Sequence, residues 1–149
     1  MMNVRSLPMI AAFAAILSAC TTTHGSSAVS TTGAPAALGP YSQGISSGNL
    51  LFLSGQIPID PATGQVFGAN IDEQTKRVMD NLSAVLAANG MTMANVVSTT
   101  VYLRDLNDFT AMNKVYGTYF SSNPPARATV QVARLPKDVA VEISAIATK

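Results

Sequence analysis

The sequence PARATVQVARLP fills residues 125–136, and VAVEI follows at residues 139–143. Side chains alternate in both segments, which is the period-two pattern of β-strands. Arg127 and Thr129 share one face of the first strand, and Glu142 lies opposite the apolar face of the second. Because the connection is short, we predict that the two strands are neighbours. Arg127 would then lie close to Glu142 among small and apolar residues, and we predict the chemistry of the protein at this pair.

Composition excludes several classes of function. The chain has 149 residues, which indicates one domain, and 11% of them are charged, less than half the usual share. Its net charge of +1 and the lack of a basic stripe give nucleic-acid binding little support. A structural zinc site needs about four Cys, His or carboxylate ligands. With one Cys and one His, both outside the predicted folded region, we predict no metal and no Cys–His nucleophile.

Residues 1–19 have the features of a bacterial targeting signal. Arg5 supplies a positive charge, and the apolar run at residues 7–17 is as long as a signal-peptide core but too short to span a bilayer. The run leads into LSAC, which resembles the lipobox of lipoproteins, so Cys20 is the predicted lipidation site. Thr21 follows instead of aspartate, which by the enterobacterial sorting rule favours a periplasmic protein held in the outer membrane by its lipid anchor alone. An ordinary secretory signal or a buried core helix is the alternative.

Residues 20–34 are predicted to form a flexible tether. After the cysteine the sequence reads TTTHGSSAVSTTGA, which is small and polar, lacks periodicity and offers little surface to bury. His24 lies here, and we interpret it as a solvated linker residue. Residues 35–149 remain for the folded domain, enough for one modest core.

The domain alternates strand and helix patterns. Residues 71–89 carry apolar side chains at helical spacing and end before Gly90, which suits a helix C-terminus. Residues 109–120 repeat the helical pattern, whereas residues 96–103 are β-branched and predict a strand. Two more strands, at residues 43–46 and 50–54, flank the hairpin signal SGN.

This order predicts an α+β fold. Each strand–helix–strand passage favours a parallel pair with a right-handed crossover, and the hairpins favour antiparallel pairs. The result is a mixed β-sheet with two helices packed on one face. The last strand carries Ala, Val or Ile side chains on both of its faces, so we expect an oligomer to cover the sheet face opposite the helices.

Five collinear motifs carry a resemblance over about residues 33–149. They are GPYSQG (39–44), SGQIP (54–58), RDLNDF (104–109), PAR (125–127) and ARLPKD…EI (133–143). Together the chain resembles the RidA/YjgF family of enamine/imine deaminases. The resemblance implies a chorismate-mutase-like fold and a homotrimer with active sites between subunits. It also implies hydrolysis, without a cofactor, of short 2-imino or 2-enamino acids, such as 2-iminobutanoate and 2-aminoacrylate, to 2-keto acids and ammonia.

The same resemblance assigns roles to single residues. Arg127 corresponds to the arginine that binds the substrate carboxylate, a task that suits its planar fork of N–H donors. Glu142 corresponds to the glutamate that positions the attacking water, and an apolar cleft would raise its pKa. Position 129 is usually cysteine in the family and is threonine here, and the loop at residues 121–125 is short. The remaining cleft positions fall on Tyr41, Ser54, Asn113 and Thr129.

Each assignment has an alternative. An arginine and a glutamate on adjacent strands, such as Arg127 and Glu142, also fit a structural ion pair. Tyr41 fits a packed core position, Ser54 a turn, and Asn113 a helix surface. At the level of function, the alternatives to the deaminase are a trimer that binds small carboxylates without catalysis and an envelope scaffold.

Overall fold

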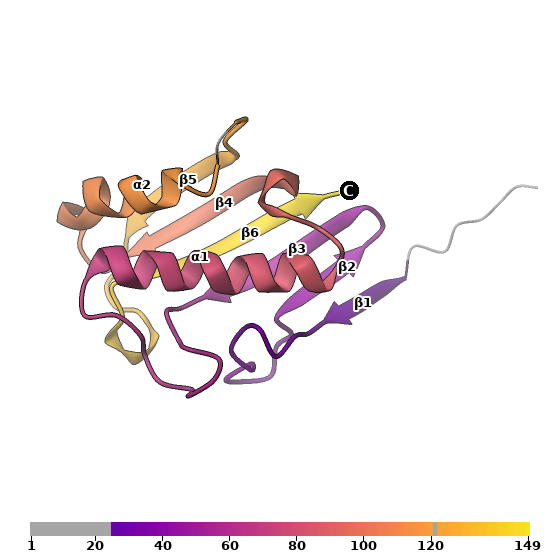
Figure 1. The fold of residues 1–149 in the computed structure, drawn as a ribbon, viewed down its shortest axis with the longest axis horizontal. Helices are drawn as coiled ribbons and strands as arrows, with labels where there is room; N and C mark the ends of the chain where they lie inside the picture. The colour runs from indigo at the N-terminus through magenta and orange to yellow at the C-terminus, as the bar shows by residue number, and fades with distance from the viewer. Residues whose placement is uncertain (1–24, 121) are drawn as a thin grey trace, which may run out of the picture.

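A computed structural model of the chain describes residues 25–120 and 122–149. The predicted signal peptide and Cys20 therefore lie outside the described residues. Figure 1 shows two helices lying across one strand layer. Three 3-10 turns lie at Met93–Asn95, Leu106–Asp108 and Pro136–Asp138. The strands and helices are β1 (Ser26–Val29), β2 (Gly44–Ser47), β3 (Leu50–Gln56), α1 (Ile71–Ala88), β4 (Val96–Leu103), α2 (Phe109–Gly117), β5 (Ala126–Gln131) and β6 (Val141–Thr148).

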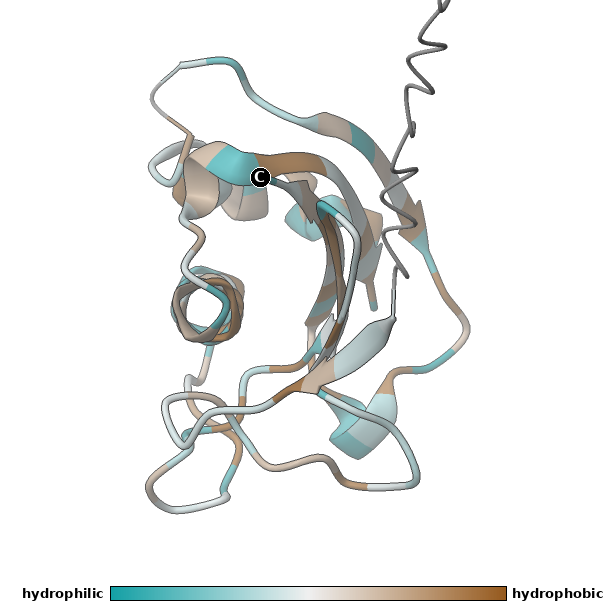
Figure 2. Ribbon diagram, turned by 90° about the vertical axis from the view of Figure 1, so that its right-hand side faces the viewer, coloured by the Kyte–Doolittle hydropathy of each residue, from teal (hydrophilic) through white to brown (hydrophobic). Residues whose placement is uncertain are grey.

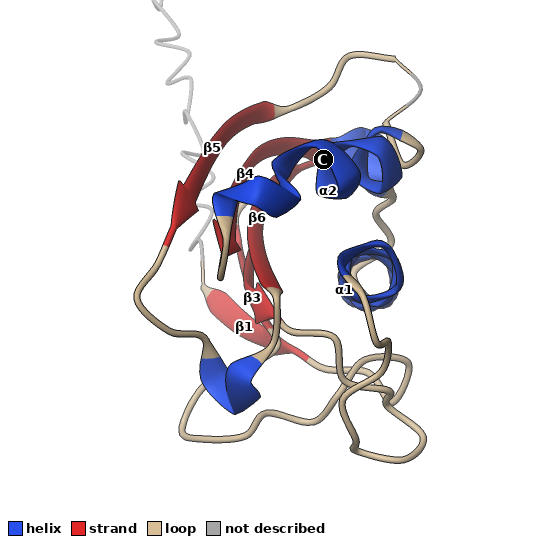
Figure 3. Ribbon diagram, turned by 90° about the vertical axis from the view of Figure 1, so that its left-hand side faces the viewer, coloured by secondary structure: helices blue, strands red, loops and turns tan. Residues whose placement is uncertain are grey.

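The strands form one mixed sheet in the order β1-β2-β3-β6-β4-β5. Among the strands that the structure describes, only the β4–β5 pair is parallel, and the other neighbouring pairs run antiparallel. Both helices lie on the same side of the curved sheet, as Figures 2 and 3 show from opposite directions. The α+β fold with two helices on one face of a mixed sheet is confirmed.

The prediction that the last two strands are neighbours is wrong. Strand β4 lies between β5 and β6, so Arg127 pairs with Thr99 whereas Glu142 pairs with Tyr102. Strand β5 follows a helical crossover from β4 and returns parallel to it, as such crossovers do. Strand β6 takes a central place, where its fully buried Val141 and its other apolar residues gain neighbours on both sides.

The predicted tether is also wrong from Ser26 onward. Strand β1 pairs with β2 at one edge of the sheet, although only Val29 of its side chains is buried. The segment after it is held by Gln43, which accepts from the Thr31 N–H at 2.6 Å and donates to the Ala34 carbonyl at 3.1 Å. Small polar residues concealed this strand because its pairing uses backbone groups rather than apolar side chains.

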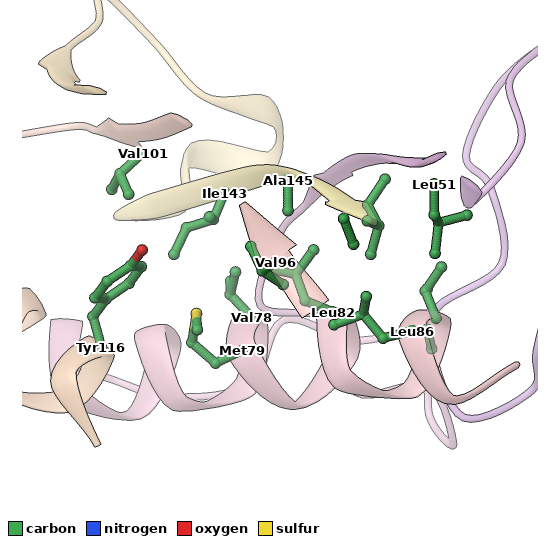
Figure 4. Close-up of a cluster of buried hydrophobic side chains, with 14 of the residues drawn as sticks. Leu51, Val78, Met79, Leu82, Leu86, Val96, Val101, Tyr116, Ile143 and Ala145 are labelled. Carbon is green, nitrogen blue, oxygen red and sulfur yellow. The ribbon is translucent and has the colours of Figure 1, made fainter. Parts of the chain in front are cut away.

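Helix α1 provides the largest apolar contact with the sheet. It begins at the cap Asn70, whose side chain accepts from the Glu73 N–H at 2.9 Å, and Gly90 follows its end with a positive φ of 68°. Its buried face meets the helix side of the sheet (Figure 4). The side chains in this contact include Val78, Met79, Leu82, Leu86, Leu51, Ile143 and Ala145.

Helix α2 ends at Gly117, three residues before the predicted end, and continues as turns through Phe120. None of the helices within the described ranges is long and apolar enough to cross a membrane.

Candidate active site

Arg127 lies in a hollow of about 490 Å³ at the free edge of the sheet. Its guanidinium carbon is 4.7 Å from the ring centroid of Tyr116 and 5.7 Å from that of Phe109, both on α2. Within residues 25–120 and 122–149, Arg127 forms no salt bridge. The arginine is thus held beside aromatic rings and keeps its charge available for an anion. The walls of this hollow, named the arginine hollow, are Asn113, Tyr116, Gly117, Phe120, Pro124, Pro125 and Arg127.

Tyr116 is fixed beneath this arginine. Its hydroxyl is 2.8 Å from the Thr99 hydroxyl in a buried hydrogen bond. Burial raises the pKa of the Tyr116 phenol, while the bond to Thr99 and the charge of Arg127 act in the opposite direction. The phenol therefore stays neutral at physiological pH.

Glu142 lies in a second hollow of about 450 Å³, on the sheet face opposite the helices. Burial raises the pKa of its carboxyl group, as expected for a proton-accepting group in a partly apolar cleft. Gly55 lies so close that a β-carbon on it would collide with the carboxylate. The walls of this hollow, named the glutamate hollow, are Leu38, Gly39, Pro40, Tyr41, Ser54, Gly55, Ile57, Pro136 and Glu142.

Tyr41 and Ser54 both line the glutamate hollow but differ in what they offer. Tyr41 is 48% exposed, which excludes the alternative of a packed core tyrosine, and its hydroxyl accepts from the Leu38 N–H at 3.0 Å. The Ser54 hydroxyl donates to the Ser42 carbonyl at 2.6 Å. Ser54 therefore supports the wall through its turn contact, and Tyr41 presents an accessible ring.

Asn113 and Thr129 lie on the side of Arg127. Asn113 lines the arginine hollow, and Thr129 pairs with the fully buried Val101, which places it on the helix side of β5. In the described part of the chain, the side-chain oxygens of both residues are buried without a hydrogen-bond partner. Buried oxygens of this kind are rare and call for a partner such as water or a ligand.

The six predicted site residues thus form two groups on opposite faces of the sheet. Arg127 lies with Asn113 and Thr129, and Glu142 lies with Tyr41 and Ser54. Neither hollow contains both charged residues, so the subunit by itself does not unite the arginine with the glutamate. The alternative of a structural Arg127–Glu142 ion pair does not occur within the subunit. On the surface, Arg134 forms a salt bridge with Asp138 at 2.8 Å.

Sequence reasoning missed Gly55 and the support of Arg127 by Tyr116. Tyr116 falls in the apolar stripe of α2, so the pattern alone indicates a core residue. For Gly55 the signal is its place in the motif SGQIP, but its contact with Glu142 joins residues far apart in the chain. No group of three or more potential metal ligands occurs among the residues that the structure describes.

Comparison with known proteins identifies the family. Residues 31–149 match the family described as Endoribonuclease L-PSP. A RutC family protein from Pyrococcus horikoshii is 53% identical over 80% of this chain and 94% of its own length. The 2-iminobutanoate/2-iminopropanoate deaminase of Escherichia coli is 46% identical over 83% of this chain and 98% of its own. A crystal structure of E. coli TdcF with bound serine covers 83% of this chain and 98% of its own, with 42% identity and a TM-score of 0.80.

The fold and the paired hollows are those of a small α+β protein with sites for small molecules. The chain belongs to the Endoribonuclease L-PSP family, which is the RidA/YjgF family that its five motifs resemble.

Proposed function

We propose that this protein hydrolyses short 2-imino and 2-enamino acids to 2-keto acids and ammonia. The observation that carries the proposal is an arginine that has no counter-ion among the described residues in one hollow, and a glutamate of raised pKa in the other. The identity to a relative named as an imine deaminase supports it.

In this reaction Arg127 holds the substrate carboxylate by two parallel N–H donors. Glu142 takes a proton from water as the water oxygen bonds to the imine carbon, which yields a carbinolamine. Return of this proton to the imine nitrogen completes the neutral carbinolamine. The carbinol hydroxyl proton then passes to the same nitrogen as the C–N bond breaks, which releases ammonia and leaves the carbonyl of the keto acid. The residues supply positioning and proton transfer, and no cofactor enters the balance.

For Arg127 and Glu142 to act on the same substrate, the arginine hollow of one subunit must face the glutamate hollow of another. The sheet face opposite the helices exposes Phe52 at 43% and Val130 at 43%, and apolar residues on a sheet face favour burial against another copy. We therefore propose a homotrimer in which the arginine hollow of one subunit faces the glutamate hollow of the next. The trimeric interface would bury the exposed apolar face and complete three sites.

A second candidate is binding of small carboxylates without hydrolysis. The relative solved with bound serine favours this candidate, because serine, like the proposed ligands, is a small molecule with a carboxylate group. A scaffold role is the remaining alternative, and it predicts binding of another protein that ignores changes in either hollow.

The test is release of 2-keto acid from 2-iminobutanoate generated in situ by an amino-acid oxidase. We expect the parent protein to accelerate hydrolysis above the uncatalysed rate and Arg127→Ala to lose the acceleration. No acceleration by the parent, together with saturable binding of 2-ketobutyrate, would overturn hydrolysis in favour of the binding candidate.

We propose further that Cys20 anchors the protein to the outer membrane and faces it to the periplasm. Oxidation of amino acids there is the class of reaction that would supply imines. Residues 21–25 alone separate Cys20 from β1, so the anchored domain would lie close to the membrane. Cys20→Ala should move the protein from the membrane fraction to the soluble fraction, and an unchanged distribution would contradict the anchor.

A further inference from the structure

Arg127 projects from the outermost strand of the sheet, where few neighbouring groups restrict its side chain. Among the strands of the described residues, β5 pairs with β4 alone, and Arg127 is exposed in the subunit. A long side chain at such a place loses considerable rotamer entropy when it binds a ligand in one fixed orientation. A contact that orients the guanidinium beforehand would reduce this loss.

The ring of Tyr116 provides that contact. It lies 4.7 Å from the guanidinium carbon, a distance typical of a cation–π interaction. The ring itself has little freedom, because Tyr116 is only 5% exposed and packs against the ring of Phe120 at a centroid distance of 4.8 Å. The guanidinium of Arg127 thus contacts an aromatic ring that is itself held in place by the core.

The hydroxyl of Tyr116 joins this ring to the strand beside Arg127. Its partner Thr99 is 2% exposed and lies directly opposite Arg127 in the β4–β5 register. Strand pairing, the Thr99–Tyr116 hydrogen bond and the ring–guanidinium contact therefore close a loop around the arginine.

We infer that Tyr116 is a positioning residue for the carboxylate-binding arginine. Its ring covers one face of the guanidinium and sets the plane in which the N–H donors meet a substrate carboxylate. The inference rests on the proposed role of Arg127. It assigns to Tyr116 a contribution to substrate binding, without contact to the reacting imine carbon.

This role predicts a change in KM rather than in kcat. Arg127 would hold the carboxylate equally in the substrate complex and in the transition state, so weaker positioning weakens both. A purely structural role for Tyr116 would instead lower the fraction of folded, active protein and leave KM unchanged.

The experiment compares Tyr116→Leu, Tyr116→Phe and the parent in imine turnover and in calorimetric binding of 2-ketobutyrate. Loss of a cation–π contact of this kind is expected to raise KM and Kd about five- to thirty-fold in Tyr116→Leu. Tyr116→Phe retains the ring but loses the hydrogen bond to Thr99, so its KM and Kd should lie between those of the parent and those of Tyr116→Leu. The matched control is Tyr119→Phe, which removes a hydroxyl bound to Asp80 at 2.8 Å elsewhere on the same segment.

Three outcomes would overturn the inference. One is an unchanged KM and Kd in folded Tyr116→Leu, the second is equal weakening by the Phe and Leu variants, and the third is equal weakening by Tyr119→Phe. If Tyr116→Leu does not fold, the parent is tested by NMR, where 2-ketobutyrate must perturb the Tyr116 ring signals together with the Arg127 side-chain N–H signal. Binding of 2-ketobutyrate without imine turnover would refute the proposed reaction and leave this test intact, whereas the absence of both binding and turnover would overturn both.

Discussion

The arginine hollow and the glutamate hollow are lined by different types of residue. Aromatic rings and prolines surround Arg127 beside α2, and a tyrosine ring supports its charge. Backbone turns, glycines and prolines surround Glu142 on the opposite face, and its carboxylate lies against Gly55. One hollow orients a cation by stacking, and the other confines an anion by close packing.

This difference explains how both charges remain available. An arginine and a glutamate on neighbouring strands would neutralise one another as a structural pair. Placing them on opposite faces of the sheet prevents that within a subunit. In the proposed trimer, the two groups would meet where a second subunit brings them together, with substrate and water between them.

The strongest test of the comparison mixes two inactive proteins. Arg127→Ala and Glu142→Gln should each lose activity by about a hundred-fold or more, because each lacks one of the groups that act together. In randomly mixed trimers, about a quarter of the interfaces would join an intact Arg127 to an intact Glu142 from different subunits. We expect co-expressed variants to recover about that fraction of the parent turnover.

The control for this mixing experiment is a sample of the two variants that were purified separately and combined without exchange of subunits. It should remain inactive. Recovery no greater than in this control would show that Arg127 and Glu142 do not act across a subunit boundary.

The second prediction concerns Gly55→Ala, which should lower kcat by less than the loss of Arg127 or Glu142 does. Its control is Gly117→Ala in the arginine hollow. A β-carbon at Gly55 would force the Glu142 carboxylate to move, whereas nothing lies within 4 Å of the corresponding position at Gly117. A displacement of a catalytic group by about 1 Å can cost about a hundred-fold in rate. We expect kcat to fall about ten- to a hundred-fold in Gly55→Ala and to stay within about three-fold in Gly117→Ala.

Thermal unfolding of both glycine variants separates displacement from misfolding. Neither glycine has a positive φ, so alanine imposes no backbone strain at either place. Equal kcat values for the two variants would mean that the close packing around Glu142 has no catalytic consequence.

The individual helices and strands could be predicted from the sequence better than their arrangement in the sheet. Helix α1 and strand β4 were found close to their observed bounds, because apolar side chains recur at helical spacing in one and β-branched residues fill the other. The faces of Arg127 and Glu142 on their own strands also follow from alternation. These properties are local, so the chain order is sufficient to predict them.

The sheet order was beyond such reasoning. The insertion of β6 between β3 and β4 depends on contacts between residues far apart in the chain, such as Val101 with Ile143 in the β4–β6 register. Strand β1 was missed for a related reason, since its evidence lies in backbone pairing and in the side chain of Gln43. The close contact of Gly55 with Glu142 also becomes visible only after folding.

The smallest expected effect concerns the stability cost of confining Glu142. Burial raises the pKa of its carboxyl above the ordinary value of 4.5, so the folded state binds this proton more tightly than the unfolded state. The resulting stabilisation is fully present below about pH 4.5 and is lost as the pH rises through the folded-state pKa. Glu142→Gln removes the charged form, and it should therefore unfold at a temperature about one to two degrees above the parent at pH 7 to 8.

This advantage of Glu142→Gln should shrink as the pH falls toward about 4.5, where the parent carboxyl is protonated as well. Arg127→Gln is the comparison from the other hollow, and its melting temperature relative to the parent should show no such trend, because arginine keeps its charge throughout this range. Thermal melts of the three proteins from about pH 4 to pH 8 make the measurement. A Glu142→Gln advantage that is equally large at both ends would assign the effect to packing against Gly55, and the confined charge would then not be the feature that distinguishes the glutamate hollow.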